Sequence, residues 1–590
     1  MPVESDVAHT VRARKIAEER ASGESVPIAE LSVESSFIRV LGVDYIHTTT
    51  EQGGDLYLTT AGFPYARHLQ PENWHDSQWF RAQRERLEGT GAVYAVPTKP
   101  IRGESLALVV KFSRVGEKVP INTDLIEDVL CCEFNGPFEE FALVEELRQS
   151  RRGSSSLKIQ TQVPLAIYVP PERTQLSGSG RFQWRVARKV ALHPGISIDI
   201  MREYIMVYGW LPGIDAWQAK TMGFLSEDEA RALNDRALNE IRDKGFSVLD
   251  MKPAHVIVQV AEPEHLLASD GQIVYGLVDF ELLERTTEYW QELKAARLET
   301  YQRRKRELLE DEDRESQTSV PLPANLCAVD ILGVDYIHGR VESTGGMLWV
   351  VGREPELYDY FLPERWRTTP QIRFMETHET YLTTSKDNIL LVWKVSRVGE
   401  RPEVAAFGPG GFRVLAYGFN SPFEKVAAAW WLRHRGIRTI LPRAIYRTGH
   451  RSQLDESLFD PSRYHAHARY RALDGEPILE ARRNYITIWD YWNGSDPVSE
   501  EEDVPVARSL SVDQAVERGL LDPQESRDLV ADCREKLERE GVEVFRLVPA
   551  HILLSIDADQ TLARDESGGL KICLCNFQYL RLPTWQEVTR

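Results

Sequence analysis

The sequence has few cysteines, and none is spaced for metal binding. Its six cysteines form no Cys-x-x-Cys pair and have no histidine at the spacing of a zinc site. We expect Cys573 and Cys575 to share one face of a strand and to pack in a core. This cysteine usage fits a reducing, cytoplasmic compartment better than an oxidising one.

Long hydrophobic runs are also missing. No stretch of the sequence approaches the 18 apolar residues of a membrane-spanning helix. The charged N-terminal segment has no apolar core of the kind found in signal peptides. We therefore expect no membrane partner and no secretion signal.

Positive charge is in deficit. The chain has 90 Asp and Glu residues against 71 Lys and Arg, a formal net charge of −19. Because such a charge repels phosphate backbones in general, we expect no nucleic-acid partner. The hydrophobic content of 42% and the aromatic content of 9% are enough to fill real cores, which excludes a disordered protein. A length of 590 residues predicts at least two domains.

Two copies of one pattern make up most of the chain. The segment Leu41-Gly-Val-Asp-Tyr-Ile-His47 recurs identically about 290 residues later, as Leu332-Gly-Val-Asp-Tyr-Ile-His338. Further matches follow in the same order, such as Asn135-Gly-Pro-Phe-Glu139 with Asn420-Ser-Pro-Phe-Glu424. A period this long indicates a duplicated domain rather than a solenoid.

The repeat predicts a domain plan. We assign residues 1–36 to a polar extension, 37–287 to copy A, 288–325 to a charged helix with a Ser/Thr/Pro linker near residue 320, and 326–590 to copy B. We expect the two copies to superpose and to pack together.

Turn and capping signals predict both strands and helices in each copy. The alternating runs around Val43 and Leu58 indicate a strand pair. Ser226 with Glu229 forms a capping box, and Gly245 is placed to end the helix that begins there. The matching helix of copy B begins at Asp522. The expected fold class is α+β.

Four motifs with chemical potential follow one another in copy A. They are the glycine-rich segment 89–96, a lysine at the end of the next apolar strand (Lys111), the polar segment 250–255 ahead of a β-branched run, and the segment 278–281 at the end of an apolar strand. Glycines let backbone N–H groups approach phosphates closely. Each motif alone is common, and it is their order that is informative.

In this order the motifs resemble the protein-kinase-like phosphotransferase superfamily, over most of residues 85–285. The resemblance implies that Gly89 and Gly91 cover the phosphates of ATP and that Lys111 pairs with the α- and β-phosphates. Asp279 would hold a magnesium ion that bridges the phosphates. ATP and magnesium are thus the implied cofactors.

The resemblance also assigns roles in the segment 250–255. Asp250 would accept or orient the proton of the substrate hydroxyl, and Lys252 would neutralise charge on the transferred phosphoryl group. His255 stands where the family has an asparagine that binds magnesium, and imidazole is a poor ligand for this hard ion. His255 is therefore a candidate metal ligand with a structural hydrogen-bonding role as its alternative.

A kinase also needs a helix glutamate that holds the strand lysine. The family places this residue about two turns into the helix, which indicates Glu145 or Glu146. We expect Glu139, at the third helical position, to cap the helix instead.

Copy A departs from the family pattern at several points. Tyr94 replaces the third glycine of the loop, and Glu281 replaces the glycine that follows Asp279 and Phe280. The stretch after Phe280 is too short for the usual helical lower lobe. The implied fold is a tandem duplication of an atypical, C-lobe-truncated kinase-like domain.

Copy B has lost the chemical residues. Arg546, Val548 and Asn576 stand at the positions of Asp250, Lys252 and Asp279. Two hypotheses stay open. In the first, copy A is a magnesium-dependent phosphotransferase and copy B its regulatory or scaffolding partner. In the second, both copies are pseudokinases, and the chain is a nucleotide-responsive or structural interaction protein. The expected partners are a nucleotide and another protein.

Overall fold

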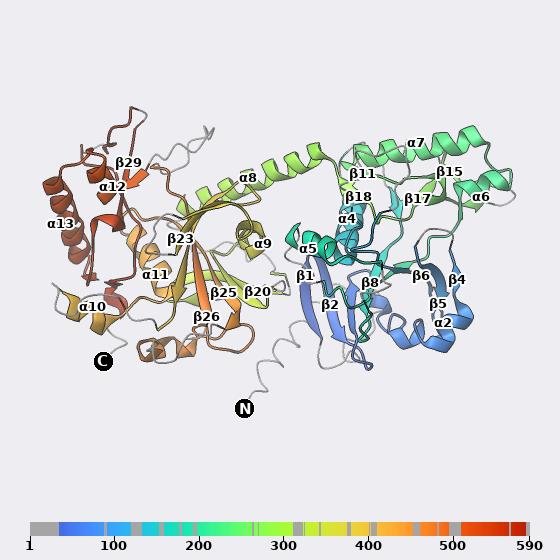
Figure 1. Ribbon diagram of the computed structural model, residues 1–590, viewed down its shortest axis with the longest axis horizontal. Helices are drawn as coiled ribbons and strands as arrows, with labels where there is room; N and C mark the ends of the chain where they lie inside the picture. The colour runs from blue at the N-terminus through green and yellow to red at the C-terminus, as the bar shows by residue number, and fades with distance from the viewer. Residues whose placement is uncertain are drawn as a thin grey trace. The chain divides into compact units, whose positions relative to one another are not determined.

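The chain divides into two compact units, unit 1 (Met1–Leu293) and unit 2 (Lys294–Arg590) (Figure 1). The computed structural model describes residues 35–87, 91–119, 133–150, 152, 159–175, 180–192, 198–261, 265–269, 271–310, 322–323, 325–341, 344–373, 379–399, 402, 410–451, 461–480, 483–494, 509–557, 559–565 and 568–585. The predicted N-terminal extension and the linker near residue 320 lie almost entirely outside these residues.

Unit 1 is built on an eight-stranded antiparallel sheet. In spatial order its strands are β1 (Ser36–Val40), β2 (Val43–Thr49), β3 (Asp55–Thr59), β8 (Pro164–Val169), β9 (Ile205–Gly209), β6 (Ala107–Phe112), β5 (Val93–Pro97) and β4 (Glu85–Arg86). The pairing of β2 with β3 confirms the strand pair predicted from their alternating residues.

Side chains alternate between the two faces of this sheet along each strand, and both faces pack against other elements of the unit. On one face Val109 and Met206 pack with Phe138 and Phe141 of α4 (Pro137–Gln149). On the other face the sheet packs against the segment 63–83, which contains η2 (Phe63–Tyr65), η3 (Pro71–Asn73) and α2 (Ser77–Gln83). The face beneath α4 is the one on which Lys111 lies.

The rest of unit 1 is a smaller mixed region at the other end of the unit (Figure 1). Its core sheet has the order β10 (Ile214–Asp215), β12 (Val256–Val258), β17 (Tyr275–Leu277) and β7 (Gln160–Thr161), and β11 (Phe246–Val248) pairs with β18 (Leu283–Arg285). The remaining elements of unit 1 are α5 (Gln183–Leu192), whose Lys189 contacts Glu139 of α4, and, in the smaller region, α6 (Ala216–Thr221), α7 (Glu227–Asp243), η4 (Pro253–His255), β13 (Val260–Ala261), β14 (His265–Leu266), β15 (Ala268–Ser269) and β16 (Gln272–Ile273).

The predicted helix signals are confirmed. Ser226 and Glu229 form the capping box of α7, and Glu139 accepts a hydrogen bond from the Gly136 N–H at the start of α4. After α7 the chain turns at Gly245, which has a φ of 89°. A Cβ there would lie 2.6 Å from the ring of Tyr289, so both the conformation and the close packing require glycine.

Unit 2 contains a second eight-stranded antiparallel sheet. Its order is β19 (Leu326–Ile331), β20 (Val334–Val341), β21 (Gly346–Val351), β25 (Pro442–Arg451), β26 (Arg483–Asp490), β24 (Leu390–Arg397), β23 (Thr380–Thr384) and β22 (Gln371–Arg373). Matched strand by strand to the large sheet of unit 1, it has the same order. The chain is thus a mixed α and β protein with two large sheets of equivalent topology.

The smaller region of unit 2 also follows the plan of unit 1. A sheet of β27 (Ser509–Ser511), β29 (Ile552–Ser555) and β30 (Ile572–Leu574) lies beside the pair of β28 (Glu543–Val544) and β31 (Leu580–Arg581). Over the whole of unit 2, including those that pack on the large sheet, the described helices are α8 (Thr287–Glu310), η5 (Pro355–Phe361), α9 (Pro363–Trp366), α10 (Gly411–Tyr417), α11 (Pro422–Arg433), η7 (Pro461–Arg469), α12 (Val512–Glu517), α13 (Pro523–Arg539), η8 (Pro549–His551) and η9 (Pro583–Trp585). The division between the units falls within α8. Of the described helices, none combines the length and the apolar character needed to cross a bilayer.

Candidate functional site

The centre of the candidate site is Lys111, a lysine of β6 that is only 5% exposed. Its Nζ donates a hydrogen bond of 2.7 Å to Asp279 Oδ1 and one of 3.1 Å to Glu140 Oε1. The carboxylate of Glu281 lies 3.6 Å away. Three carboxylates from two distant parts of the chain thus surround one buried ammonium group.

The ammonium group of Lys111 and the surrounding carboxylates shift one another's pKa values. Burial lowers the pKa of Lys111, but the charges of Asp279, Glu140 and Glu281 outweigh it, so that the pKa is raised above its ordinary value. Burial raises the pKa of Glu140, against the charge of Lys111 and a 2.7 Å hydrogen bond from the Tyr208 hydroxyl. A buried ion pair is stable only with such additional hydrogen bonds.

Glu281 links Lys111 to a second cation. Its Oε1 accepts a 3.1 Å hydrogen bond from Arg114, and the side chain is 6% exposed. Burial raises the pKa of Glu281 to about 7 against the charge of Lys111, and the negative charge of Asp279 adds to the effect of burial. Glu281 is therefore part of the charged cluster, whereas the sequence showed only that it replaces the glycine of the family motif.

The helix partner of Lys111 was predicted wrongly. Neither Glu145 nor Glu146 reaches the lysine: Glu145 lies beside Arg148, and Glu146 binds Arg285 through hydrogen bonds of 2.9 and 3.1 Å. The first turn of α4, and not the second or third, is the part that lies next to Lys111, so Glu140 makes the contact. The adjacent Glu139 caps the helix as predicted.

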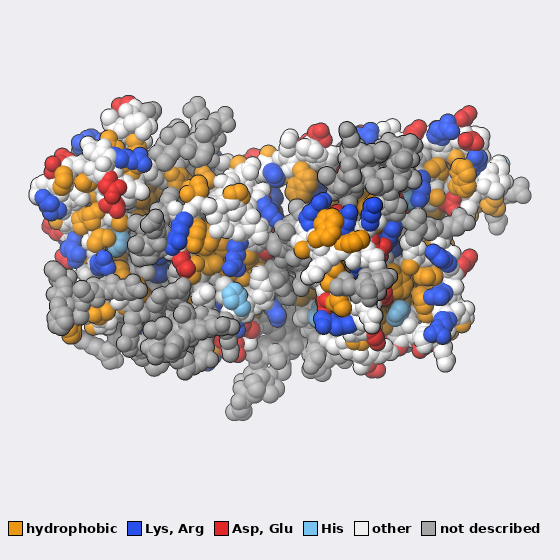
Figure 2. All heavy atoms as spheres, viewed as in Figure 1, with side chains coloured by type: hydrophobic (Ala, Val, Ile, Leu, Met, Phe, Trp, Pro, Cys, Tyr) orange, Lys and Arg blue, Asp and Glu red, His pale blue; other side chains and the backbone are white. Residues whose placement is uncertain are grey.

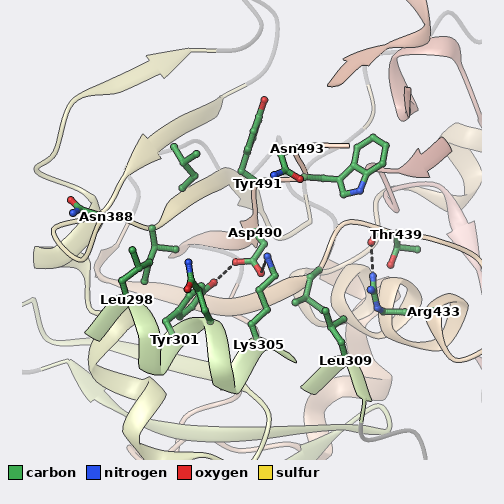
Figure 3. Close-up of a pocket in the computed structure, with 15 residues that line it drawn as sticks. Leu298, Tyr301, Lys305, Leu309, Asn388, Arg433, Thr439, Asp490, Tyr491 and Asn493 are labelled. Atoms are coloured by element: carbon green, nitrogen blue, oxygen red, sulfur yellow. Dashed lines mark hydrogen bonds and ion pairs between the residues drawn. The ribbon is translucent and has the colours of Figure 1, made fainter. Parts of the chain in front are cut away.

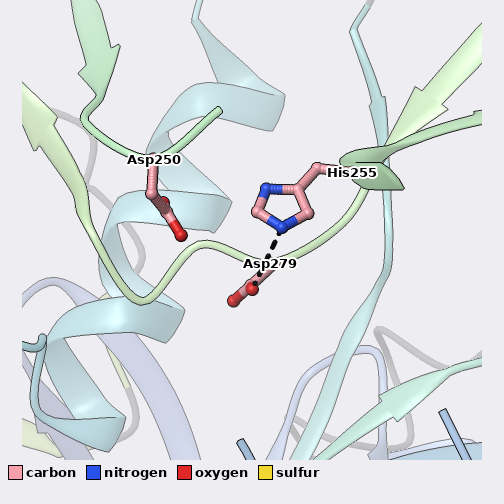
Figure 4. Close-up of side chains that lie close together, drawn as sticks. All are labelled: Asp250, His255 and Asp279. Carbon is pink, nitrogen blue, oxygen red and sulfur yellow. Dashed lines mark ion pairs between the residues drawn. The ribbon is translucent and has the colours of Figure 1, made fainter. Parts of the chain in front are cut away.

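Asp250, His255 and Asp279 come together next to this cluster (Figure 4). Asp250 precedes η4, His255 ends it, and Asp279 follows β17. One potential ligand atom of each lies within 4.8 Å of the others, and His255 Nε2 is 3.5 Å from Asp279 Oδ2. Within the described residues, Asp250 Oδ1 and His255 Nδ1 are buried and have no hydrogen-bond partner.

The three groups have different protonation preferences. Burial raises the pKa of Asp250 to about 6, and the charge of Asp279 adds to this shift. Burial lowers the pKa of His255 to about 4, so the imidazole is neutral at pH 7. For Asp279 the effect of burial is outweighed by the charge of Lys111, and its pKa falls to about 2. The cluster thus offers one firm carboxylate, one neutral imidazole and one carboxylate that exchanges a proton near neutrality.

Three predicted site residues remain: Lys252, Gly91 and Gly89. Lys252 is exposed and forms no ion pair with any described residue. Gly91 is half-buried, and a Cβ there would meet Arg114 at an ordinary 3.6 Å, so the site does not demand glycine at this position. Gly89 lies outside the described residues.

An asparagine that the sequence analysis did not single out positions the segment with Asp279. Asn135 Nδ2 donates to the carbonyl oxygens of Phe280 (3.2 Å) and Leu283 (2.8 Å), and the Asn135 N–H donates to the carbonyl of Glu281. This side chain therefore fixes the backbone that follows Asp279, which itself has a left-handed φ of 65°.

Unit 2 repeats this positioning contact. Asn420 Nδ2 donates to the carbonyl oxygens of Phe577 and Leu580, at 2.7 Å each. The recurrence of Asn135 as Asn420 within the matched segments was the sequence signal for this role.

The charged cluster itself is not repeated in unit 2. Lys394 of β24 donates a 2.8 Å hydrogen bond to Gln578, and at the position of Glu140 stands Lys425, which bonds Ser396 at 2.9 Å. Burial lowers the pKa of Lys394 to about 8. Asn576 bonds Gln578 in place of an acid–lysine contact. Unit 2 therefore has the lysine without the carboxylates that hold its equivalent in unit 1.

A separate cavity of about 70 Å³ lies in unit 2, between α8 and the ends of the strands of the large sheet (Figure 3). Asp490 lies at its centre and contacts Tyr301 and Lys305 of α8. Arg433 of α11 lines the far side and donates to the carbonyl of Thr439 at 2.9 Å. No motif of the sequence pointed to this cavity.

On the face seen in Figure 2, basic and acidic side chains are interspersed rather than gathered into patches.

No protein-family model matches the sequence, and a search of curated proteins found no match to it.

Proposed function

We propose that unit 1 is an atypical protein-kinase-like domain that binds Mg-ATP and transfers its terminal phosphoryl group, and that unit 2 is a non-catalytic copy of the same truncated domain. The proposal rests chiefly on the pairing of Lys111 with both Glu140 and Asp279. Kinases require a strand lysine held by a helix glutamate and a metal-binding aspartate at the end of a later strand. Asp250 lies nearby, from the loop where the family carries its catalytic aspartate.

The arrangement of elements supports the same proposal. The lysine of a kinase lies on the third strand of its upper sheet and pairs with the helix that follows. In unit 1 the strands β4, β5 and β6 pair in this order, Lys111 lies on the third of them, and α4 is the next described helix along the chain. The equivalent order of the large sheet in unit 2 supports an origin by duplication.

The donor atoms of this cluster fit a divalent cation, and the imidazole among them favours manganese over magnesium. Asp279 and His255 would hold the ion, and the partnerless Nδ1 of His255 and Oδ1 of Asp250 show that this cluster has polar capacity to spare. Imidazole suits manganese better than magnesium. When bound, such an ion neutralises charge on the phosphates.

The protein groups have the properties that phosphoryl transfer needs. A base should have a pKa near the working pH, and burial brings the pKa of Asp250 to about 6. Lys252 is exposed and so free to meet the transferred group. Lys111 would bind the phosphates that lie nearer the nucleoside.

The alternative is a unit 1 that binds nucleotide, or only partners, without catalysis. The observation in its favour is that Glu281 and Arg114 already complete the surroundings of Lys111, so that phosphates must compete with an acidic side chain. In this case the whole chain acts as an interaction protein that responds to nucleotide.

The replacement of Asp250 by asparagine distinguishes the two functions. The variant Asp250→Asn keeps the size and shape of the side chain and removes its charge and its capacity to accept a proton. If Asp250 is the base, turnover falls about a hundredfold to ten-thousandfold while ATP binding is retained. We would measure transfer of the γ-phosphate and ATP hydrolysis with magnesium and with manganese.

Unit 2 supplies the matched control. Arg546 stands at the position of Asp250, and Arg546→Ala should leave turnover within a few-fold of wild type. Equal rates for wild type and Asp250→Asn, both above a blank without enzyme, would rule out Asp250 as the base. Nucleotide binding by wild type without turnover under either metal would establish the non-catalytic alternative.

A further inference from the structure

The cavity of unit 2 has an excess of positive charge. Lys305 and Arg433 line it, and Arg443, which is not itself a lining residue, has its guanidinium 4.8 Å from the centre of the Tyr301 ring. Asp490 is the only carboxylate among the lining residues, and its two oxygens already face Tyr301 and Lys305. Asp490 thus has two cations within 4 Å, Lys305 at 3.3 Å and Arg443 at 3.9 Å.

Hydrogen-bond donors are in excess as well. The indole Nε1 of Trp492, a lining residue that is 5% exposed, has no partner among the residues described. The nitrogens of the Arg443 guanidinium, which is 1% exposed, likewise have no hydrogen bond to the described chain, and its nearest carboxylate oxygen, of Asp490, is 3.9 Å away. Buried donors without partners are rare in native proteins and require an explanation.

The equivalent positions in unit 1 show that the fold does not need these charges. Pro442 pairs with Trp489 as Pro164 pairs with Tyr208, which places Arg443 at the position of Leu165 and Asp490 at that of Gly209. A buried charged pair is often no more stabilising than apolar residues of similar volume. The charges of unit 2 are therefore explained better by something they bind than by the stability of the sheet.

We propose that this cavity binds a small organic anion, a carboxylate with a short apolar body. Its oxygens take the N–H of Trp492 and the ammonium of Lys305. Its apolar part lies against the leucines of the lining (Leu298, Leu309, Leu390 and Leu441).

The lining favours an organic anion over inorganic phosphate. Apolar side chains make up a large part of the wall, and Asp490 lies at its centre beside Tyr301 and Lys305, with further polar side chains such as Asn388 and Arg433 at opposite sides (Figure 3). Small-molecule sites combine apolar walls with a few fixed polar groups in this way. A phosphate ion would leave the leucine walls without a partner.

Titration of the full chain with acetate, butyrate and benzoate tests the proposal. We would use calorimetry in a buffer free of carboxylate and phosphate, with butyramide as the uncharged analogue and inorganic phosphate as the alternative anion. Butyrate or benzoate should bind at one site per chain, more tightly than acetate, and butyramide and phosphate should give no signal.

Two variants locate the site. Trp492→Phe removes the indole N–H together with the five-membered part of the ring system and keeps an aromatic ring, and it should weaken binding about tenfold or more, as expected for the loss of a hydrogen bond to a charged acceptor. Lys305→Met should weaken binding at least as much. Trp430→Phe and Lys536→Met, which change a half-buried tryptophan of α11 and an exposed lysine of α13, should bind like wild type.

Three results would overturn the proposal. They are the absence of any carboxylate signal, binding of phosphate in preference to carboxylates, and unchanged carboxylate affinity in both Trp492→Phe and Lys305→Met. Circular dichroism and the melting temperature of each variant without ligand establish that it is folded before its affinity is compared. Because the site is independent of Asp250 and Lys111, these outcomes do not depend on whether unit 1 is a phosphotransferase.

Discussion

The buried cluster around Lys111 makes a strong prediction about stability. In Lys111→Met the carboxylate of Glu140, 1% exposed, loses the cation that compensates it, and Glu281 keeps only Arg114. Removing one partner of a buried ion pair costs about 3–5 kcal/mol, because the remaining charge stays buried without compensation. We expect a loss of this size in the free energy of unfolding of unit 1.

The effect should be visible in calorimetric melting of the full chain. For domains of this size, 1 kcal/mol corresponds to roughly 2–4 °C, so the transition of unit 1 should fall by about 10 °C. The carboxylates of the variant have folded-state pKa values above their unfolded values. Their cost is therefore present above the unfolded pKa and disappears as the pH falls, so the deficit in melting temperature should narrow from pH 8 towards pH 5.

The double variant Lys111→Met/Glu140→Gln tests the cause. It removes the cation together with its most buried acid, and it should recover part of the stability lost in Lys111→Met. Lys536→Met, a change of the same kind on the exposed face of α13, should leave both transitions within about 1 °C of wild type. A Lys111→Met protein that melts with wild type at every pH would refute the reasoning, since a buried lysine with three carboxylate neighbours cannot be removed without cost.

Three further predictions concern single side chains. In Asp279→Asn the new side chain tolerates the left-handed φ of 65° but carries no charge. The magnesium-dependent increase in melting temperature with ATP should therefore disappear while the unliganded fold persists. An unchanged increase would exclude Asp279 as the metal ligand. Burial lowers the pKa of Lys394 from 10.5 to about 8. As the pH rises from 8 to 10.5, the stability of wild type should therefore rise relative to Lys394→Met, by up to about 3 kcal/mol in urea unfolding. Parallel pH curves of the two proteins would contradict this. Asn135→Ala leaves the carbonyls of Phe280 and Leu283 without their donor and should cost about 1–3 kcal/mol, and an unchanged urea midpoint would show that the contact is not needed.

The features that follow from local sequence could be predicted. The capping box of Ser226 and Glu229, the capping by Glu139 and the turn at Gly245 are set by residues within a few positions of one another. Such contacts are fixed by backbone geometry alone. The motifs also singled out Lys111 and Asp279, both at the ends of apolar strands, and the structure pairs these two side chains.

The partner of Lys111 could not be predicted from position along the helix. The choice between Glu140 and Glu146 depends on which turn of α4 lies beside β6, and this is decided by packing of Phe138 and Phe141 on the sheet. One signal was present in the sequence: Glu140 is replaced by Lys425 in the matched segment of copy B. A charge reversal beside a retained lysine is expected where an ion pair has been lost.

The cavity of unit 2 was beyond prediction for a different reason. Arg443 and Asp490 are charged residues within apolar strands, and a single sequence does not show whether such residues are buried or at an edge. Their contact requires the pairing of β25 with β26, and the contact of Asp490 with Tyr301 requires α8 to lie against strands that follow it by more than a hundred residues.

The two units have large sheets of the same strand order and carry different charges on them. Asn135 and Asn420 make the same backbone contacts, so the segment that carries Asp279 in unit 1 is still held in place in unit 2, where it carries Asn576. Had unit 2 only decayed, its buried positions would tend towards apolar residues, because these cost least to bury. Instead Arg443 introduces a buried charge where unit 1 has none. The loss of acids at one site and the gain of a charged set at another are what is expected if unit 2 exchanged one ligand for another.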